Sequence, residues 1–109
     1  MDGSHLRFYV HENDRVDGQI AWEWLLVQAN ALGVRGGSAF RAMAGFGRHR
    51  TLHEERFFEL AGSVTVELDF IVTEDEARQM LELVAREKLR VFYARVPAQF
   101  GVLGGEATD

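Results

Sequence analysis

Cysteine is absent from the 109 residues of this chain, and proline occurs once. Without cysteine the protein has no disulfide, no thiolate metal ligand and no cysteine nucleophile, which suits a reducing compartment. No apolar run approaches the roughly 20 residues that a membrane-spanning helix needs. The first residues also lack the charged-then-apolar layout of a secretion signal. We therefore expect a soluble, cytoplasmic protein.

A basic excess is also missing, because the formal net charge is −5. This balance argues against binding to nucleic acid, whose phosphates require a basic face. The sequence contains no Walker motif, dinucleotide fingerprint or nucleophile motif, and turn or capping roles account for Asp14 and Asp17. We expect a single domain over residues 1–109. We expect it not to be an enzyme and to require no cofactor.

Alternation of apolar and polar residues predicts four strands. The expected ranges are 6–11, 38–44, 64–72 and 90–96, with Pro97 ending the last. In the second of these strands we expect Phe40 to point inward and Arg41 outward. The polar residues 1–5 should be frayed and the tail 98–109 irregular.

Helical spacing appears twice between these strands. Residues 19–32 carry one apolar stripe that includes Trp24 and Val27, and a second, weaker stripe that includes Trp22 and Leu26. Thr73 and Glu76 form a capping box that predicts the start of the second helix. The second stripe on the first helix suggests burial beyond a single sheet.

The resulting order is strand, helix, strand, strand, helix, strand. This order predicts a ferredoxin-like α+β fold, with a four-stranded antiparallel sheet and two helices on one face. The open face should carry Arg7, Tyr9, Arg41, Met43, Glu67, Asp69, Tyr93 and Arg95. Because Tyr, Met and Arg are enriched at interfaces, we interpret this face as an oligomer surface. The alternative is a solvated face with ordinary cross-strand ion pairs.

The same topology brings three segments to one end of the sheet. They are HEND (residues 11–14), GFGRHRTLHEER (45–56) and AREKLR (85–90). Their cationic side chains are Arg48, Arg50, Arg56, Arg86, Lys88 and Arg90. In a chain of negative net charge, this cluster predicts a local anion-binding patch.

Residues 6–97 resemble the PII-like family known as domain of unknown function 190, or UPF0166. The resemblance rests on an acidic loop after the first strand, here Glu12 and Asp14, and on Gly-Phe-Gly after the second, here 45–47. A long loop with histidines and basic residues follows, here 48–55. The chain departs from the family pattern before the third strand, where AGSV replaces a Leu-Pro-type turn. It departs again where AREKLR replaces a glycine-rich phosphate loop.

The resemblance implies a homotrimer with ligand clefts between subunits. It also implies a mobile loop after the second strand that reports the ligand state to a protein target such as a membrane transporter. An adenine nucleotide is the ligand it suggests, since glycine amides and arginines suit phosphate oxygens. The expected ligand-binding residues are Gly45, Phe46, Gly47, Arg48, His49, Arg50, Glu12, Asp14, Lys88 and Arg90.

A divalent metal site is the alternative function. His49 and His53 are four residues apart and would share a face if their segment were helical. Trimeric divalent-ion tolerance proteins of the CutA type make this alternative relevant. The neighbouring Arg48 and Arg50 would repel a cation, which favours histidines without a metal.

Overall fold

Two central strands organise the sheet in this computed structural model, which describes residues 1–45 and 64–105. β1 (Asp2–His11) pairs antiparallel with β5 (Thr65–Val72). Leu6 lies opposite Phe70, and Phe8 lies opposite Leu68, and each of these side chains is at most 1% exposed. The rings of Phe8 and Phe70 meet edge to face, with centroids 6.2 Å apart. The alternation predicted for both strands is confirmed.

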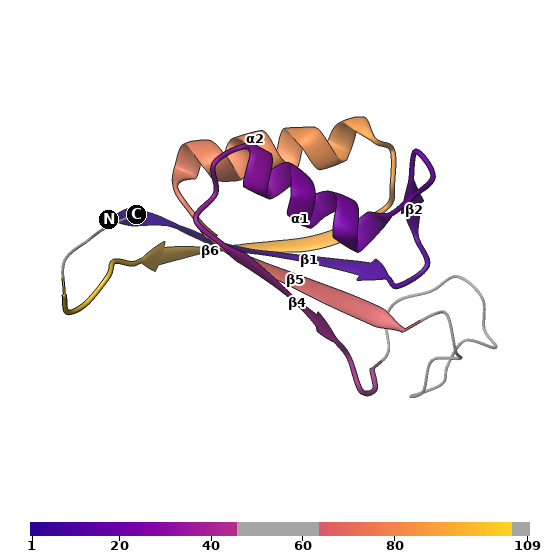
Figure 1. Cartoon of the computed structure of the whole chain (residues 1–109), viewed down its shortest axis with the longest axis horizontal. Coiled ribbons are helices and arrows are strands. Elements are labelled where there is room, and N and C mark those ends of the chain that lie inside the picture. The colour runs from indigo at the N-terminus through magenta and orange to yellow at the C-terminus, as the bar shows by residue number, and fades with distance from the viewer. Residues whose placement is uncertain (46–63, 106–109) are drawn as a thin grey trace.

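Two edge strands complete the sheet. β4 (Gly37–Arg41) pairs with β5, and β6 (Phe92–Gln99) pairs with β1, so that the order is β4-β5-β1-β6 and every pairing is antiparallel. The helices α1 (Ala21–Ala31) and α2 (Glu74–Arg86) lie together on one face (Figure 1). This is the ferredoxin-like arrangement that the sequence predicts. We call the opposite face of the sheet the uncovered face.

A small hairpin connects β1 to α1. Its strands are β2 (Arg15–Val16) and β3 (Gln19–Ile20). The two residues between them, Asp17 and Gly18, have φ values of 50° and 82°. Positive φ at both central positions favours Asp-Gly, and it matches the twist of paired strands. The hairpin occupies residues that the sequence analysis assigned to a loop and to the start of the first helix.

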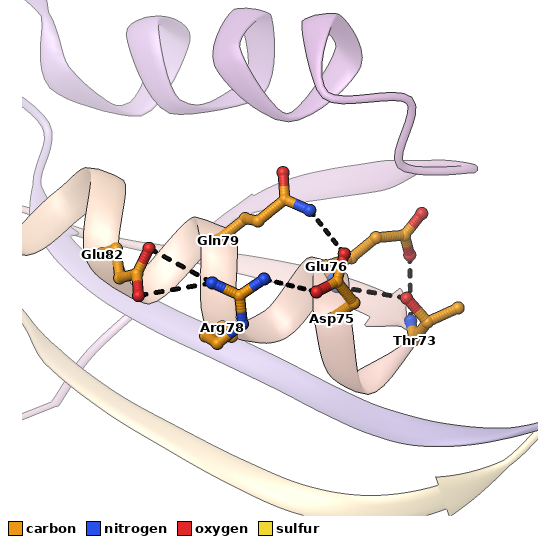
Figure 2. A network of polar contacts seen from close by, with 6 residues as sticks. All are labelled: Thr73, Asp75, Glu76, Arg78, Gln79 and Glu82. Carbon is orange, nitrogen blue, oxygen red and sulfur yellow. Dashed lines mark hydrogen bonds and ion pairs between the residues drawn. The ribbon is translucent and has the colours of Figure 1, made fainter.

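α2 begins with the capping box that the sequence predicts. The Thr73 hydroxyl accepts a hydrogen bond from the backbone N–H of Glu76, and the Glu76 carboxylate accepts one from the backbone N–H of Thr73. Figure 2 shows how Arg78, one turn further on, bonds Asp75 and Glu82 along the exposed side of the helix. Contacts of this kind stabilise a surface helix by a few tenths of a kcal/mol each. In the described part of the chain, neither helix is long and apolar enough to cross a membrane.

α1 buries a different set of residues from the one predicted. Trp24 is buried as expected, but Val27 is 60% exposed. Leu25 is buried instead, because the inward stripe of the helix follows Ala21, Trp24 and Leu25. Trp22 and Leu26 from the second predicted stripe are half-buried against the core of the same chain. That stripe therefore gives little reason to expect a neighbouring subunit.

Two strand boundaries also differ from the prediction. β1 begins at Asp2, so residues 2–5, which we expected to be frayed, belong to the central strand. β6 continues through Pro97 to Gln99. β6 is an edge strand and bonds on one side only, so a proline whose nitrogen points away from β1 removes no ladder hydrogen bond.

The uncovered face carries only part of the set that we predicted. Arg7, Tyr9, Glu67 and Asp69 lie on it as expected, since they are opposite one another in the β1–β5 register. The positions of the two edge strands were wrong. Arg41 pairs with Val66, Tyr93 with Phe8 and Arg95 with Leu6, which places these three on the helix side. Met43 lies beyond the end of β4 and is fully exposed.

Apolar residues of the edge strands occupy the uncovered face instead. Phe40 lies opposite Glu67, and Phe92 lies opposite Tyr9 with ring centroids 5.7 Å apart. Their exposed fractions are 55% and 72%. The contacts of Arg95 confirm the orientation of β6, because its guanidinium donates to Glu74 at the start of α2, over 2.9 Å.

Close packing explains the orientation of β4. Gly37 lies opposite Phe70, and a Cβ atom at Gly37 would be 2.3 Å from the Phe70 ring. Only a residue without a side chain fits between this position and the core. Gly37 and Ala39 therefore face the helices, and Phe40 is forced outward although it is the larger apolar residue.

We expect Gly37→Ala to lower the free energy of unfolding by about 1–3 kcal/mol, the usual cost of overpacking a core. Gly36→Ala is the matched control, because a Cβ at Gly36 meets nothing within 4 Å. That control should change stability by less than about 0.5 kcal/mol. Urea unfolding at one fixed protein concentration measures both variants. Equal stability of the two would contradict the packing that we describe.

Candidate functional site

The loop after β1 is the first part of the predicted site, and its backbone is tightly held. The Asp14 carboxylate accepts a hydrogen bond from the backbone N–H of His11 over 2.9 Å, and the Asp14 N–H donates to the His11 carbonyl over 3.0 Å. The Asp14 carbonyl in turn accepts from Ala21 at the start of α1. These bonds give Asp14 a structural role in fixing the loop.

Glu12 joins this loop to the two neighbouring strands. Its backbone N–H donates to the Val64 carbonyl over 2.8 Å, and its carboxylate pairs with Arg41 at the end of β4. The Glu12 side chain is only 15% exposed. A largely buried carboxylate requires a partner, and Arg41 supplies it. Arg41 thus belongs to this site, although the sequence analysis placed Arg41 on the uncovered face.

The chain on either side of residues 46–63 is anchored to the sheet. Ala42 donates its backbone N–H to the Thr65 carbonyl over 2.9 Å, which continues the β4–β5 pairing by one step. Val64, on the other side, accepts from Glu12. Ala42 and Val64 therefore both lie at the end of the sheet that carries the HEND loop, and β4 and β5 run side by side towards that end (Figure 1). This adjacency is the one predicted from the topology.

Several of the predicted ligand-binding residues fall within residues 46–63. These are Phe46, Gly47, Arg48, His49 and Arg50, together with His53 of the metal alternative, and all of them lie outside the described residues. Gly45 is described. Its φ is not positive, and a Cβ there would meet nothing within 4 Å. Neither its conformation nor its described surroundings require glycine at this position.

The turn between α2 and β6 brings cationic side chains to the same end of the sheet. α2 ends at Arg86, and β6 begins at Phe92, which pairs with Tyr9 near the end of β1. Lys88 and Arg90 lie between them and are exposed, as Arg86 is. Exposed cations at the end of a sheet can bind an anion without a large desolvation cost.

Lys88 has a left-handed backbone conformation that its residue type does not predict. Its φ is 60°, in the left-handed region, and it directly follows the helix cap Glu87. Glycine usually occupies this position after a helix, since other L-residues meet a steric penalty there. The turn is therefore strained at a residue that we also place in the candidate site.

The central strands form a second polar cluster, on the uncovered face. Asp69 accepts hydrogen bonds from Arg7 and His5, each over 2.9 Å, and Arg7 lies 3.3 Å from Glu67. His5 was missed because residues 1–5 were expected to be frayed. Ion pairs of this kind are what a solvated sheet face would show, which was the alternative interpretation of this face. Exposed Phe40 and Phe92 on the same face favour an interface instead.

The pKa values of the two carboxyl groups in this cluster are shifted in opposite directions. Partial burial acts to raise the pKa of Asp69, but hydrogen bonds from Glu67, Arg7 and His5 outweigh it and lower that pKa. The pKa of Glu67 is raised, because its carboxyl group hydrogen-bonds to Asp69 and is partly removed from water. Of these two carboxyl groups, Asp69 therefore keeps its negative charge to a lower pH than Glu67 does.

A metal site has no support in the described part of the chain. Across residues 1–45 and 64–105, no group of three or more His, Cys, Asp or Glu side chains is arranged to hold a metal ion. The metal alternative rests on His49 and His53, which lie beyond these ranges.

The fold of this chain is shared with a solved structure. A putative PII-like signaling protein from Thermus thermophilus has a similar fold, with a TM-score of 0.60 and 15% sequence identity. The likeness covers 89% of this chain and 87% of that one.

The sequence comparisons identify the family. Residues 3–92 match the family model of domain of unknown function 190, described as "Uncharacterized ACR", and the chain belongs to this family. A UPF0166 protein from Aquifex aeolicus (strain VF5) is 28% identical over 96 residues, which are 81% of this chain and 91% of that protein.

The left-handed turn allows a direct test. Lys88→Gly should be more stable than Lys88→Ala by about 1 kcal/mol, because only glycine relieves the left-handed penalty. Both variants remove the amine, so charge does not distinguish them. Thermal and urea unfolding give the comparison. An alanine variant as stable as the glycine variant would show that position 88 is not left-handed in solution.

Proposed function

We propose that this chain is a PII-like regulatory protein that binds an adenine nucleotide at the end of its sheet and signals through the segment that follows β4. The observation that carries the proposal is the anchoring of the residues on either side of this segment, at the end of the sheet that carries the HEND loop. Ala42 bonds Thr65, Glu12 bonds Val64, and the Glu12 carboxylate pairs with Arg41. A ligand bound here would contact the chain where residues 46–63 begin and end.

The charge of this end suits phosphate groups. Arg86, Lys88 and Arg90 project from the α2–β6 turn, and the sequence adds Arg48 and Arg50. Charge-assisted hydrogen bonds from arginine to phosphate are among the stronger polar contacts in proteins. Glycine at position 45 leaves space for a ligand to approach the backbone.

The proposed role is regulatory. The site offers exposed cations and a Glu12 carboxylate that is paired with Arg41, whereas acid–base catalysis needs a titratable group near the reacting atoms with a pKa suited to the reaction. Nucleotide binding would change residues 46–63, and a protein target such as a membrane transporter would recognise that change. Coupling of this kind requires that the ligand favour one state of the segment over another.

We also propose a homotrimer formed through the uncovered face, with the ligand between subunits. Phe40, Phe92 and Val96 are exposed on that face, with exposed fractions from 53% to 72%. Apolar side chains around a polar centre favour association, because burial recovers about 25 cal/mol for each Å² of apolar surface.

The trimer predicts a specific response to charge on the uncovered face. Phe92→Asp should convert the trimer to a monomer, because three carboxylates would be buried without partners. Val27→Asp is the control, since Val27 is 60% exposed but lies on α1, away from the uncovered face. Light scattering at micromolar concentration measures the mass. A monomeric wild type would reject the trimer, and dissociation by Val27→Asp alone would move the interface to α1.

Calorimetric titration with ATP, ADP and AMP tests nucleotide binding. Arg48→Ala should weaken binding by about 1.5–3 kcal/mol, the value of a hydrogen bond to a charged group, and should leave thermal stability nearly unchanged. Arg78→Ala is the control, because Arg78 pairs with Asp75 and Glu82 on the exposed side of α2. If no nucleotide binds at millimolar concentration, or if Arg48→Ala binds as well as the wild type, the proposal is wrong.

A further inference from the structure

A hollow lies at the end of the sheet opposite the candidate nucleotide site. Its volume is about 470 Å³, which is within the range of small-molecule sites in proteins. Three parts of the chain form it: the connection from α1 to β4, the end of β5, and the residues that precede β1 and follow β6. The lining includes Arg35, Gly36, Ile71, Phe100, Gly101 and Val102, with Met1.

The part of the wall formed by Met1, Ile71 and Phe100 is held by the sheet. Met1 and Phe100 exchange two backbone hydrogen bonds of 2.9 Å, which extend the β1–β6 ladder by one pair. The Phe100 ring packs where a side chain at Gly3 would project, since a Cβ at Gly3 would be 2.8 Å from the ring. Ile71 lies within β5, opposite His5. The hollow therefore exists before any ligand binds, which lowers the entropic cost of binding.

The lining combines apolar side chains with a single charged one. Ile71, Phe100 and Val102 supply an apolar surface, and Arg35 is the only ionised side chain among the residues that line the hollow. Arg35 also takes part in an interaction within the subunit. A guanidinium has five N–H donors, so it can hold a ligand in addition to that contact.

This combination selects a class of ligand. One guanidinium matches the two oxygens of one carboxylate, and the Met1 ammonium, the other cation of the lining, already donates to the Phe100 carbonyl. The apolar walls exclude a small hydrated anion, which would gain nothing from them. An aromatic ring or a branched hydrocarbon would fill the space beside Phe100 and Ile71.

We propose that this hollow binds a small carboxylate with an aromatic or branched aliphatic body, held by the Arg35 guanidinium and packed against Phe100 and Ile71. The site shares no residue with the sheet-end site, so it does not depend on the proposed nucleotide binding. The Thr65 end of β5 lies at the sheet-end site, and the hollow lies at the opposite end of the same strand.

Titration of the full chain with 1-naphthoate tests the proposal by nuclear magnetic resonance. We expect saturable shifts of the Ile71 methyl groups and of the Gly36 and Gly101 amides, and no shift at Lys88 or Arg90. The uncharged methyl ester of naphthoate is the matched ligand. It should bind at least about ten-fold more weakly, since it cannot form the charge-assisted pair.

Two variants separate the apolar part of the site from the charged part. Gly36→Leu adds a side chain where a Cβ meets nothing within 4 Å, so it should narrow the hollow without strain and weaken naphthoate at least about ten-fold. Arg35→Gln should cause a similar loss. Arg78→Gln removes an arginine from the exposed side of α2 and should bind naphthoate as the wild type does.

Absence of saturable shifts at millimolar naphthoate overturns the proposal, and so does equal binding of the acid and its ester. Shifts that spread over Phe40 and Phe92 would show adhesion to the uncovered face and would also contradict it. If Gly36→Leu alters the oligomer mass while naphthoate does not bind, the hollow is a contact between copies of the chain. If Arg35→Gln unfolds, the Gly36→Leu result and the ester comparison still decide the question.

Discussion

The pairing of β1 with β5 is the constraint on which the rest of the structure depends. In its register Leu6 lies against Phe70 on the helix side, and Arg7 lies against Asp69 on the uncovered side. A slip of one residue would exchange the two sets. It would expose side chains whose burial contributes about 1.5–3 kcal/mol each, and it would bury an ion pair at a large desolvation cost. One register therefore defines the core, the polar centre of the uncovered face and the positions of both edge strands.

The two ends of β5 have different chemistry, which follows from what flanks them. At the Thr65 end, the chain turns through HEND and the α2–β6 turn, and the side chains are mostly charged. At the Val72 end, Ile71 and Phe100 line the hollow, and Arg35 supplies its charged side chain.

Long alternating segments and local hydrogen bonds were predictable from the sequence, and features that depend on distant residues were not. The pattern of β5 and the Thr73–Glu76 box are local, and both predictions were confirmed. The orientation of β4 depends on the fit of Gly37 beneath Phe70, which is a contact between separate strands. That error also hid the pairing of Arg41 with Glu12. The HEND loop and the start of β5 were placed together correctly, because topology alone decides which strand ends are neighbours.

The position of β1 in the middle of the sheet has a consequence for folding. The first strand of the described chain joins two strands from its second half: Arg7 pairs with Asp69, 62 residues away, and Met1 bonds Phe100, 99 residues away. Contacts of such long range close large loops and slow the folding reaction. During synthesis β1 emerges long before β5 and β6, with both of its edges unpaired and its apolar side chains in water. Until those strands emerge, the newly made chain is most vulnerable to aggregation at β1.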